Sequence, residues 1–355
     1  MILRDLLRVL GTSDRRNGRN LTHDEAYRAF LSILDGTESE IQVGAFLIAM
    51  RWKGVTTEEL VGFAHAARER ATIPCLGMAD LVCVCPPHDG YDSFPPLEVS
   101  ASLAAAGAGT RVMLISDRGV PPRRGLTAAN VMEELGAAMT WDPAAVERWI
   151  ERTRLGVIAA SGMLPHLLGL RRVRGEVGVR TPLSTVEKLV APSTAAVVLG
   201  AQSGPVLGSA VETIAGLGHP RGIAIQGVGG GVIPTLRRRT RGIELAGTHK
   251  VPLTVEPADF GLQLGVDPDL PIFGPPEEGQ GTGDSPLVVQ AAAELIERVL
   301  RGEGGAARNA TLLGAAVILK AAGRTPTLAE GVDAARGSLD SGAALAVLEG
   351  LRAES

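Results

Sequence analysis

The first seventy residues carry a helical pattern of apolar positions that short polar stretches divide into compact segments. Residues 41–54 read Ile-Gln-Val-Gly-Ala-Phe-Leu-Ile-Ala-Met-Arg-Trp-Lys-Gly, which predicts a short helix that is apolar on nearly every face and stops at Gly54. A helix of this kind has to be buried within a domain or against a partner. We therefore expect a helical domain at residues 1–75 that forms the interface of a homodimer.

Three capping motifs mark where the helices of this domain begin. Each pairs a hydroxyl residue with a Glu or Gln three residues later, so that both side chains satisfy free backbone donors. The pairs are Thr22 with Glu25, Ser39 with Gln42, and Thr56 with Glu59.

From residue 76 onward the pattern changes to buried strands that alternate with helices. Strands are expected at 81–85, 111–116, 157–160, 195–199 and 222–226, and helices at 99–106, 127–135, 143–154, 206–217, 287–301, 307–322 and 327–351. Such alternation indicates a mostly parallel central sheet flanked by helices. The predicted fold class is therefore α/β, with a small amino-terminal helical domain (1–75) and a larger domain (76–355).

Composition and charge indicate the location of the protein in the cell more than its function. The net charge of −4 gives no global attraction to nucleic acid. No apolar run approaches the ~20 residues needed to span a membrane, and the charges within residues 1–10 are unlike a signal peptide. Three cysteines without the spacing of a zinc site indicate reduced thiols. We expect a cytoplasmic protein without a membrane partner.

Both ends of the chain resemble anthranilate phosphoribosyltransferases. The similarity lies in residues 21–26, 42–54 and 56–60 of the helical domain and in residues 298–313 and 328–345 near the carboxyl end, so it covers roughly residues 1–350. The resemblance implies a reaction that joins an aromatic amine to the ribose of phosphoribosyl pyrophosphate. Pyrophosphate then leaves with the help of magnesium.

The first substrate motif of that family is degenerate here. The family has Gly-Thr-Gly-Gly-Asp-Gly after the first strand and Asn-x-Ser-Thr at the next helix, whereas this chain keeps only Asp89, Gly90 and Ser100. The four prolines of residues 86–96 cannot donate hydrogen bonds to a phosphate. Glu98 replaces the asparagine and is expected to repel phosphate. A plain turn is the simpler interpretation of Asp89-Gly90.

The second and third motifs survive in part. Arg118 and Gly119 stand where the family has Lys-His-Gly-Asn-Arg, and Arg118 could supply one positive charge. The resemblance implies that Arg174, six residues before Arg180, contacts the carboxylate of the amine substrate, with His166 nearby. The residues themselves leave another interpretation open, in which the two arginines form structural ion pairs and His166 is a packed surface residue.

The fourth motif, a neighbouring Asp-Glu pair that holds magnesium, has no counterpart in the loop of residues 227–235. We therefore predict no catalytic residue, no metal site and no cofactor. Magnesium would be required only if the chain is an active transferase.

Arginines gather where these motifs are lost. Residues 237–241 read Arg-Arg-Arg-Thr-Arg, and other arginines stand near the degenerate motifs. Together they could line a basic groove for an anionic backbone, although a solvated hairpin tip explains an isolated basic run equally well. The predicted polyanion-binding residues are Arg123, Arg124, Arg171, Arg172, Arg237, Arg238, Arg239 and Arg241.

Two functions follow from this sequence. The pattern resembles a divergent branch of the family that keeps the fold and the dimer but has lost the substrate motifs, which implies a homodimer that binds nucleic acid or another polyanion. The alternative is an active glycosyl- or phosphoribosyltransferase with an altered substrate.

Overall fold

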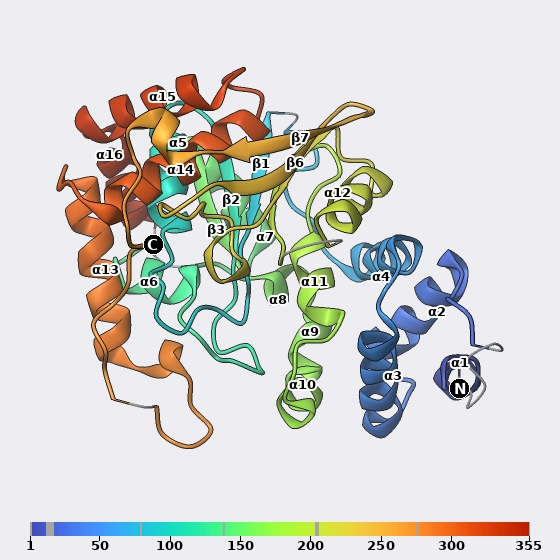
Figure 1. Cartoon of the computed structure of the whole chain (residues 1–355). Coiled ribbons are helices and arrows are strands. Elements are labelled where there is room, and N and C mark those ends of the chain that lie inside the picture. Colours follow the sequence, from blue (N-terminus) through green and yellow to red (C-terminus); the bar gives the residue numbers. More distant parts are fainter. Residues whose placement is uncertain are drawn as a thin grey trace.

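A seven-stranded sheet lies at the centre of the computed structural model, which describes residues 2–11, 18–78, 80–137, 139–202, 206–274 and 276–354 (Figure 1). The strands are β1 (Leu81–Cys85), β2 (Arg111–Ile115), β3 (Leu155–Ile158), β4 (Ala196–Gly200), β5 (Arg221–Ile225), β6 (Thr240–Ala246) and β7 (His249–Val255). Their order is β3-β2-β1-β4-β5-β6-β7. The first five pair in parallel, and β6 and β7 add an antiparallel hairpin. The predicted α/β fold class is confirmed.

Helices cover both faces of this sheet. On one face the core is built from Val82, Val84, Val112 and Leu114 of the strands and from two helices that flank β2 in sequence together with the four helices at the carboxyl end. These helices are α5 (Glu98–Gly107), α6 (Ala128–Glu134), α13 (Pro286–Leu300), α14 (Ala306–Ala321), α15 (Leu328–Asp340) and α16 (Ala343–Glu354). Because apolar side chains alternate along buried strands, each face of the sheet has a core of its own.

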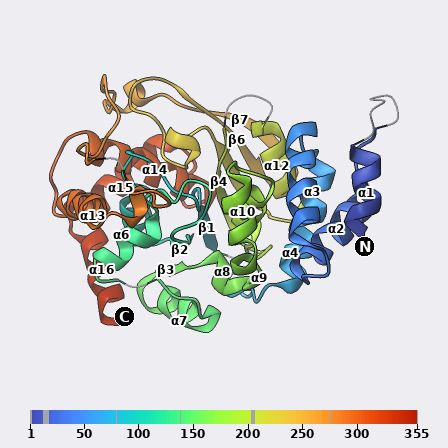
Figure 2. The same ribbon diagram turned by 90° about the horizontal axis from the view of Figure 1, so that it is seen from below.

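The opposite face packs against the helical domain and a group of short helices, as the second view makes clear (Figure 2). Cys83, Cys85, Met113 and Ile115 point to this side. The helices are α1 (Ile2–Leu10), α2 (His23–Leu34), α3 (Glu40–Lys53), α4 (Thr57–Arg70), α8 (Ala160–Met163), α9 (His166–Gly169), α10 (Arg171–Val177), α11 (Leu183–Val186) and α12 (Val206–Gly216), with α7 (Pro143–Thr153) beside β3. All three cysteines are free and buried.

The three capping boxes predicted from the sequence are all present at the starts of α2, α3 and α4. The burial of α3 differs from the expectation. Val43, Phe46, Leu47 and Met50 are buried, but Trp52 is 88% exposed and Ile41 nearly as much. In the single chain this helix therefore buries one face only, and a partner for the other face remains a prediction.

A partly buried arginine joins the helical domain to the larger domain. Arg68 of α4 donates to the carbonyls of Leu189 (2.9 Å) and Leu217 (3.0 Å) and to Nε2 of His219. Nδ1 of His219 then donates to the carbonyl of Ala195. Burial lowers the pKa of Arg68 to about 10 and that of His219 to about 4. The two parts of the chain share this polar contact and one apolar core, and the boundary at residue 75 remains a prediction.

The hairpin of β6 and β7 is an element that the sequence analysis missed. Its turn lies around Gly247, between the two strands. The arginine run 237–241 lies at the opposite end of β6, where the connection from the antiparallel strand β5 arrives, so the interpretation of that run as a solvated hairpin tip remains a prediction. Among the described residues, every helix is too short or too polar to cross a bilayer.

Candidate functional site

Two adjoining cavities open at the carboxyl ends of the parallel strands. In open α/β sheets, ligands bind at this edge where the strand order reverses. Here the reversal lies between β1 and β4, because β2 and β3 continue on one side and β5 on the other. The structure therefore places its candidate site where the topology predicts one.

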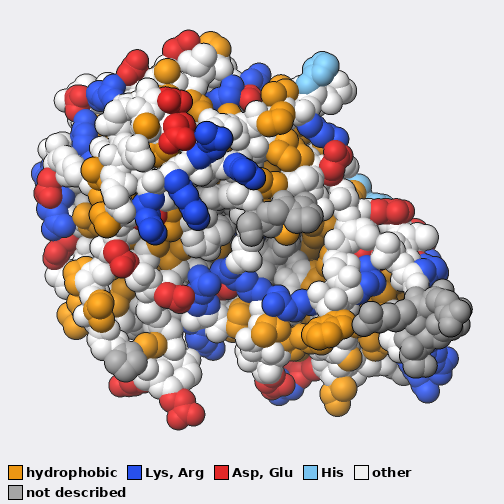
Figure 3. Space-filling view, in the orientation of Figure 1, with side chains coloured by type: hydrophobic (Ala, Val, Ile, Leu, Met, Phe, Trp, Pro, Cys, Tyr) orange, Lys and Arg blue, Asp and Glu red, His pale blue; other side chains and the backbone are white. Residues whose placement is uncertain are grey.

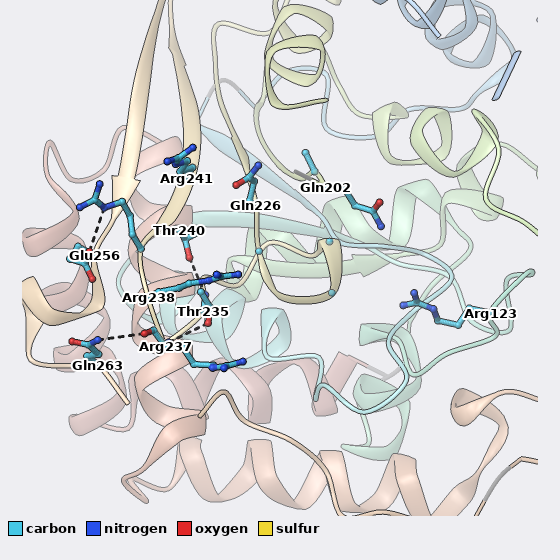
Figure 4. A pocket seen from close by; sticks show the side chains of 15 residues that line it. Arg123, Gln202, Gln226, Thr235, Arg237, Arg238, Thr240, Arg241, Glu256 and Gln263 are labelled. Carbon is cyan, nitrogen blue, oxygen red and sulfur yellow. Dashed lines mark hydrogen bonds and ion pairs between the residues drawn. The ribbon is translucent and has the colours of Figure 1, made fainter. Parts of the chain in front are cut away.

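The larger cavity, which we call the arginine cleft, has a volume of about 990 Å³ (Figure 4). Arg123 points into it from one side, and Arg237 and Arg238 point toward it from the other. Its lining comes from the ends of β4 and β5, the glycine-rich loop that follows β5, the arginine run, the loop before α6 and the segment that follows β7. The lining residues are Arg123, Ala201, Gln202, Gln226, Gly227, Gly229, Gly230, Thr235, Arg237, Arg238, Arg239, Thr240, Arg241, Glu256 and Gln263.

Most of the positive charge in the arginine cleft is not neutralised by the protein. Within the described chain, Arg237, Arg238 and Arg241 are exposed and have no carboxylate partner. Arg239 lies 3.5 Å from Glu256, and Arg123 lies 3.5 Å from Asp92 while it donates to the carbonyl of Gly90 (2.8 Å). The space-filling view shows Lys and Arg side chains around a hollow in this face (Figure 3).

The smaller cavity, the inner pocket, has a volume of about 280 Å³ and shares Ala201, Gln202 and Gly230 with the cleft. Arg51 and Val55 reach it from the helical domain. The other lining residues are Pro87, Asp89, Arg180, Thr181, Pro182, Ser184, Thr185, Lys188, Leu199, Gly200, Val206 and Ala210.

Asp89 and Arg180, two predicted site residues, meet at the edge of the inner pocket. Nε and Nη2 of Arg180 donate to the two carboxylate oxygens of Asp89 at 2.6 and 2.7 Å. Gly90 follows with φ +73°, and a Cβ there would lie 2.4 Å from the backbone of Gly125. This pair and the tight turn fix the loop after β1, so Arg180 lies at the site with its charge already paired.

Arg174 lies in the protein interior and lines neither cavity. Its guanidinium forms an ion pair with Glu187, and both side chains are almost fully buried. It also donates to the carbonyl of Pro121 (2.9 Å) and to the hydroxyl of Ser184 (3.2 Å). Of the two interpretations drawn from the sequence, this geometry matches the structural ion pair.

Tyr91 closes the gap between the loop after β1 and the glycine-rich loop after β5. Its ring is buried, and a Cβ on Gly229 would lie 2.9 Å from Cδ1 of that ring. A Cβ on Gly231 would lie 2.1 Å from its hydroxyl oxygen. These glycines therefore make room for an aromatic side chain rather than for a phosphate.

Glu98 does not face either cavity, which corrects the expectation that it repels phosphate. It is fully buried, and the Tyr91 hydroxyl donates to its Oε2 at 3.3 Å. Burial raises the pKa of Glu98 to about 8, so this carboxyl group is mostly protonated at neutral pH.

The remaining predicted substrate residues are dispersed. Ser100 is buried and shares a hydrogen bond with Thr311 (2.7 Å), which corrects its assignment to the site. Arg118, beside Gly119, pairs with Glu133 and lies over the ring of Trp141. His166 begins the short helix α9 and lines neither cavity.

Three of the predicted polyanion-binding arginines also lie outside the cleft. Arg171 is 3.4 Å from Asp117, and Arg172 pairs with Glu40 of the helical domain. Arg124 is exposed and has φ +51°. The structure thus brings together Arg123, Arg237, Arg238, Arg239 and Arg241, and leaves the other three apart.

Several lining residues had no signal in the sequence. Lys188 and Arg51 come from segments distant from the degenerate motifs, and Gln202 and Gln226 follow strands without belonging to a motif. The one available signal was the position of Gln202 and Gln226 within two residues of the ends of β4 and β5, because the carboxyl ends of parallel strands meet at one edge.

The acids that line the cavities do not suit magnesium. Glu256 lies against Arg239, and Asp89 is held by Arg180. Within the described ranges, no group of three or more His, Cys, Asp or Glu side chains could hold a metal ion. Magnesium is usually held by one or two carboxylates together with substrate phosphates, so the expected absence of a magnesium site remains a prediction.

Comparison with known proteins places the chain in a family. The helical bundle domain of the glycosyl transferase family matches residues 13–71, and its a/b domain matches residues 89–345. An anthranilate phosphoribosyltransferase of Rubrobacter xylanophilus is 33% identical over 94% of this chain and 93% of its own length. One from Methanosphaerula palustris is 32% identical over 99% and 98%. The chain belongs to the anthranilate phosphoribosyltransferase family.

Solved structures of the family agree with the fold. The anthranilate phosphoribosyltransferase of Thermus thermophilus is 28% identical and superposes with a TM-score of 0.81, covering 100% of this chain and 99% of that one. The Saccharomyces cerevisiae protein in complex with PRPP and Mg has a TM-score of 0.78 at 19% identity, covering 99% and 97%. At that identity the second likeness concerns the fold alone.

Proposed function

We propose that this family member binds a polyanion, specifically the sugar-phosphate backbone of a nucleic acid, in the arginine cleft. The observation that carries the proposal is the group of unpaired guanidinium groups, Arg237, Arg238 and Arg241, on one wall of a cavity of about 990 Å³. Their mutual repulsion is relieved when an anion with several charges lies between them. Guanidinium groups also present a planar fork of donors that fits phosphate oxygens.

The same geometry disfavours the standard reaction. A phosphate needs free backbone donors, whereas the loop after β1 begins with prolines and the glycine-rich loop after β5 is packed on Tyr91. Glu256 and Asp89, which line the cavities, are held by arginines. We therefore infer that anthranilate phosphoribosyl transfer is absent, and no step of that reaction is assigned to residues of this chain.

Calorimetry separates the two functions. The full chain is titrated with phosphoribosyl pyrophosphate plus magnesium, and in parallel with single-stranded DNA at low salt. We expect heat of binding with DNA only, and no anthranilate turnover near the ordinary enzymatic rate of ~1 s⁻¹ or more. Magnesium-dependent turnover at that rate, or no DNA binding at low salt, contradicts the proposal.

The homodimer is part of this proposal. Ile41, Ile48 and Trp52 lie seven and four residues apart on α3, so they share one face, and all three are exposed. An apolar face of this kind is typical of an interface.

Trp52→Glu is expected to give a monomer in light scattering at micromolar concentration, while Arg28→Glu on the neighbouring helix α2 leaves the dimer intact. A monomeric unmodified chain contradicts the assignment.

The second candidate is an active transferase with an altered substrate. The relatives named above are anthranilate phosphoribosyltransferases, and the inner pocket lies at the topological switch point. Under this alternative, phosphoribosyl pyrophosphate binds in the calorimetric experiment and magnesium strengthens its binding.

A further inference from the structure

Lys188 is a buried cation without a carboxylate partner. Its side chain belongs to the 3₁₀ turn η1 (Glu187–Leu189), is only 9% exposed, and lines the inner pocket. Nζ donates to the carbonyl of Gly200 at 3.1 Å, and within the described chain it has no other hydrogen-bond or ion-pair partner. The neighbouring Glu187 is already paired with Arg174. An ammonium group has three donors, so two of them remain available inside the pocket.

Buried donors without partners cost free energy unless a ligand satisfies them. Burial lowers the pKa of Lys188, and the nearby charge of Arg180 lowers it further. Whether charged or neutral, the nitrogen still donates hydrogen bonds. The inner pocket therefore favours a ligand that offers acceptor atoms.

The walls of the inner pocket favour a largely apolar ligand that carries acceptor atoms at its edge. Val55, Pro87, Leu199 and Ala210 present apolar surface, which cannot replace the hydration of a phosphate. Asp89, the acid among these lining residues, is paired with Arg180, while Arg51 and Lys188 leave the pocket with an excess of positive charge that favours electron-rich acceptor atoms. A volume of about 280 Å³ is slightly below the ~300–1,000 Å³ typical of sites for drug-sized ligands. This size suits a single ring system rather than a whole nucleotide.

The two cavities meet at Gln202 and Gly230, so a ligand in the inner pocket can be continuous with one in the arginine cleft. A single strand of nucleic acid has this form, because its phosphates and its unstacked bases lie on opposite sides of one chain.

We propose that the inner pocket receives one extruded base of a single-stranded nucleic acid whose phosphates lie on the arginine cleft, and that Lys188 selects a base with carbonyl oxygens. The proposal rests on the proposed function, since the strand is held by the cleft. Thymine and uracil present carbonyl oxygens, each of which has two lone pairs for the two available donors of Lys188, whereas adenine accepts only through ring nitrogens that have one lone pair each and, at N1 and N7, an amino donor beside them. Ser184 and Thr185, which also line the pocket, can serve either as donors or as acceptors.

The test compares oligothymidylate and oligoadenylate of equal length by fluorescence anisotropy, with the full chain at one fixed low salt concentration. We expect oligothymidylate to bind about tenfold more tightly, the scale of one hydrogen bond to a charged donor. Lys188→Met keeps the length of the side chain and removes its donors. In this variant we expect the preference to vanish, with the oligoadenylate affinity and its salt dependence unchanged.

Lys320→Met is the matched control, because Lys320 pairs with Glu244 and lies outside both cavities. It is expected to retain the preference. Val206→Trp tests the pocket independently of the buried lysine, since Val206 is 48% exposed at its rim and can be enlarged without disturbing the core. We expect that variant to lose the preference as well.

The outcomes separate the two proposals. Oligoadenylate stacks on itself, so a preference caused by stacking persists in Lys188→Met and overturns the base-reading role. Equal affinity of the unmodified chain for both strands also overturns it, while the cleft proposal stands. If neither strand binds at low salt, the proposed function fails and the base-reading role fails with it.

Discussion

Two walls at the same edge of the sheet treat charge in opposite ways. The packed wall comprises the loop of residues 86–98 with Arg174 and Arg180, and the arginine wall comprises residues 237–241. In the packed wall Arg174 is paired with Glu187, and Arg180 with Asp89. In the arginine wall the described structure pairs only Arg239, with Glu256.

This difference in pairing shows which arginines are available to a ligand. Arg174 and Arg180 match the family motif, yet their charges are already used to hold the packed wall. Arg237, Arg238 and Arg241 match no motif, yet they carry free charge beside a large cavity. A motif match therefore says less about ligand binding than the partners of the side chain do.

The largest expected stability effect comes from breaking the packed wall at Arg174. Arg174→Ala leaves Glu187 as a buried charge without its partner, and such changes cost about 3–5 kcal/mol. Arg238→Ala removes an exposed, unpaired group and is expected to change stability by less than about 0.5 kcal/mol. Urea unfolding of both variants makes the comparison. Equal effects of the two substitutions would mean that the walls do not differ as described.

A smaller effect is the pH dependence of stability that Glu98 gives to the packed wall. The folded-state pKa of Glu98 is about 8, above its ordinary value of 4.5, so the folded state binds the proton more tightly. The contribution of this group is thus fully present below about pH 4.5 and is lost as the pH rises toward 8. Glu98→Gln removes this dependence, so the stability of the variant relative to the unmodified chain should rise by about 3–4 kcal/mol between pH 5 and pH 8.

His219 provides an internal reference for that measurement, because its sign is opposite. Its folded-state pKa is lowered to about 4 from 6.5, so its contribution is present above pH 6.5 and is lost as the pH falls. Chemical unfolding across the range in the unmodified chain and in Glu98→Gln resolves the two. A Glu98→Gln variant with an unchanged pH profile contradicts the protonated carboxyl group.

The smallest effect tests how the gap between the two loops is closed. Tyr91→Phe keeps the ring against Gly229 and Gly231 but removes the hydrogen bond to Glu98. We expect a loss of about 1 kcal/mol in thermal or urea unfolding. Ser338→Ala is a suitable control, since the buried Ser338 hydroxyl has no hydrogen-bond partner within the described chain. A loss several times larger in Tyr91→Phe means that the hydroxyl, rather than the ring, holds the packed wall.

The sequence was sufficient for the parts of the fold that rest on local signals. The capping pair Thr22 and Glu25 marks the start of a helix by chemistry within four residues, and an apolar run such as 81–85 marks a buried strand. The hairpin of β6 and β7 was missed because the arginine run at its start masks the alternation of apolar and polar positions that follows. Alternation of Ile243 and Leu245 with Glu244 was nevertheless present.

The candidate site was predictable only in part, because its properties depend on distant partners. Arg174 has a structural role because it pairs with Glu187, which is thirteen residues away in the sequence. Lys188 is held at the inner pocket by its hydrogen bond to the carbonyl of Gly200. Glu98 does not repel a phosphate as expected, because the fold buries its carboxyl group against Tyr91. Neither burial nor ion pairing between separate segments can be derived from spacing along one chain. The clustering of Arg237, Arg238 and Arg241 was local, and for that reason the sequence indicated it.

Polyanion binding in the arginine cleft is tested most directly by the salt dependence of single-stranded DNA binding. The variant to measure has Arg237, Arg238, Arg239 and Arg241 changed to Ala. Each phosphate contact contributes roughly 0.7 to the slope of log affinity against log salt for single strands. We predict that this slope falls by about two to three and that affinity at low salt drops without sequence preference. Changing Arg8, Arg28, Arg298 and Arg336, which are exposed elsewhere, controls for net charge. An unchanged slope in the folded cleft variant, or an equal fall in the control, would contradict the account.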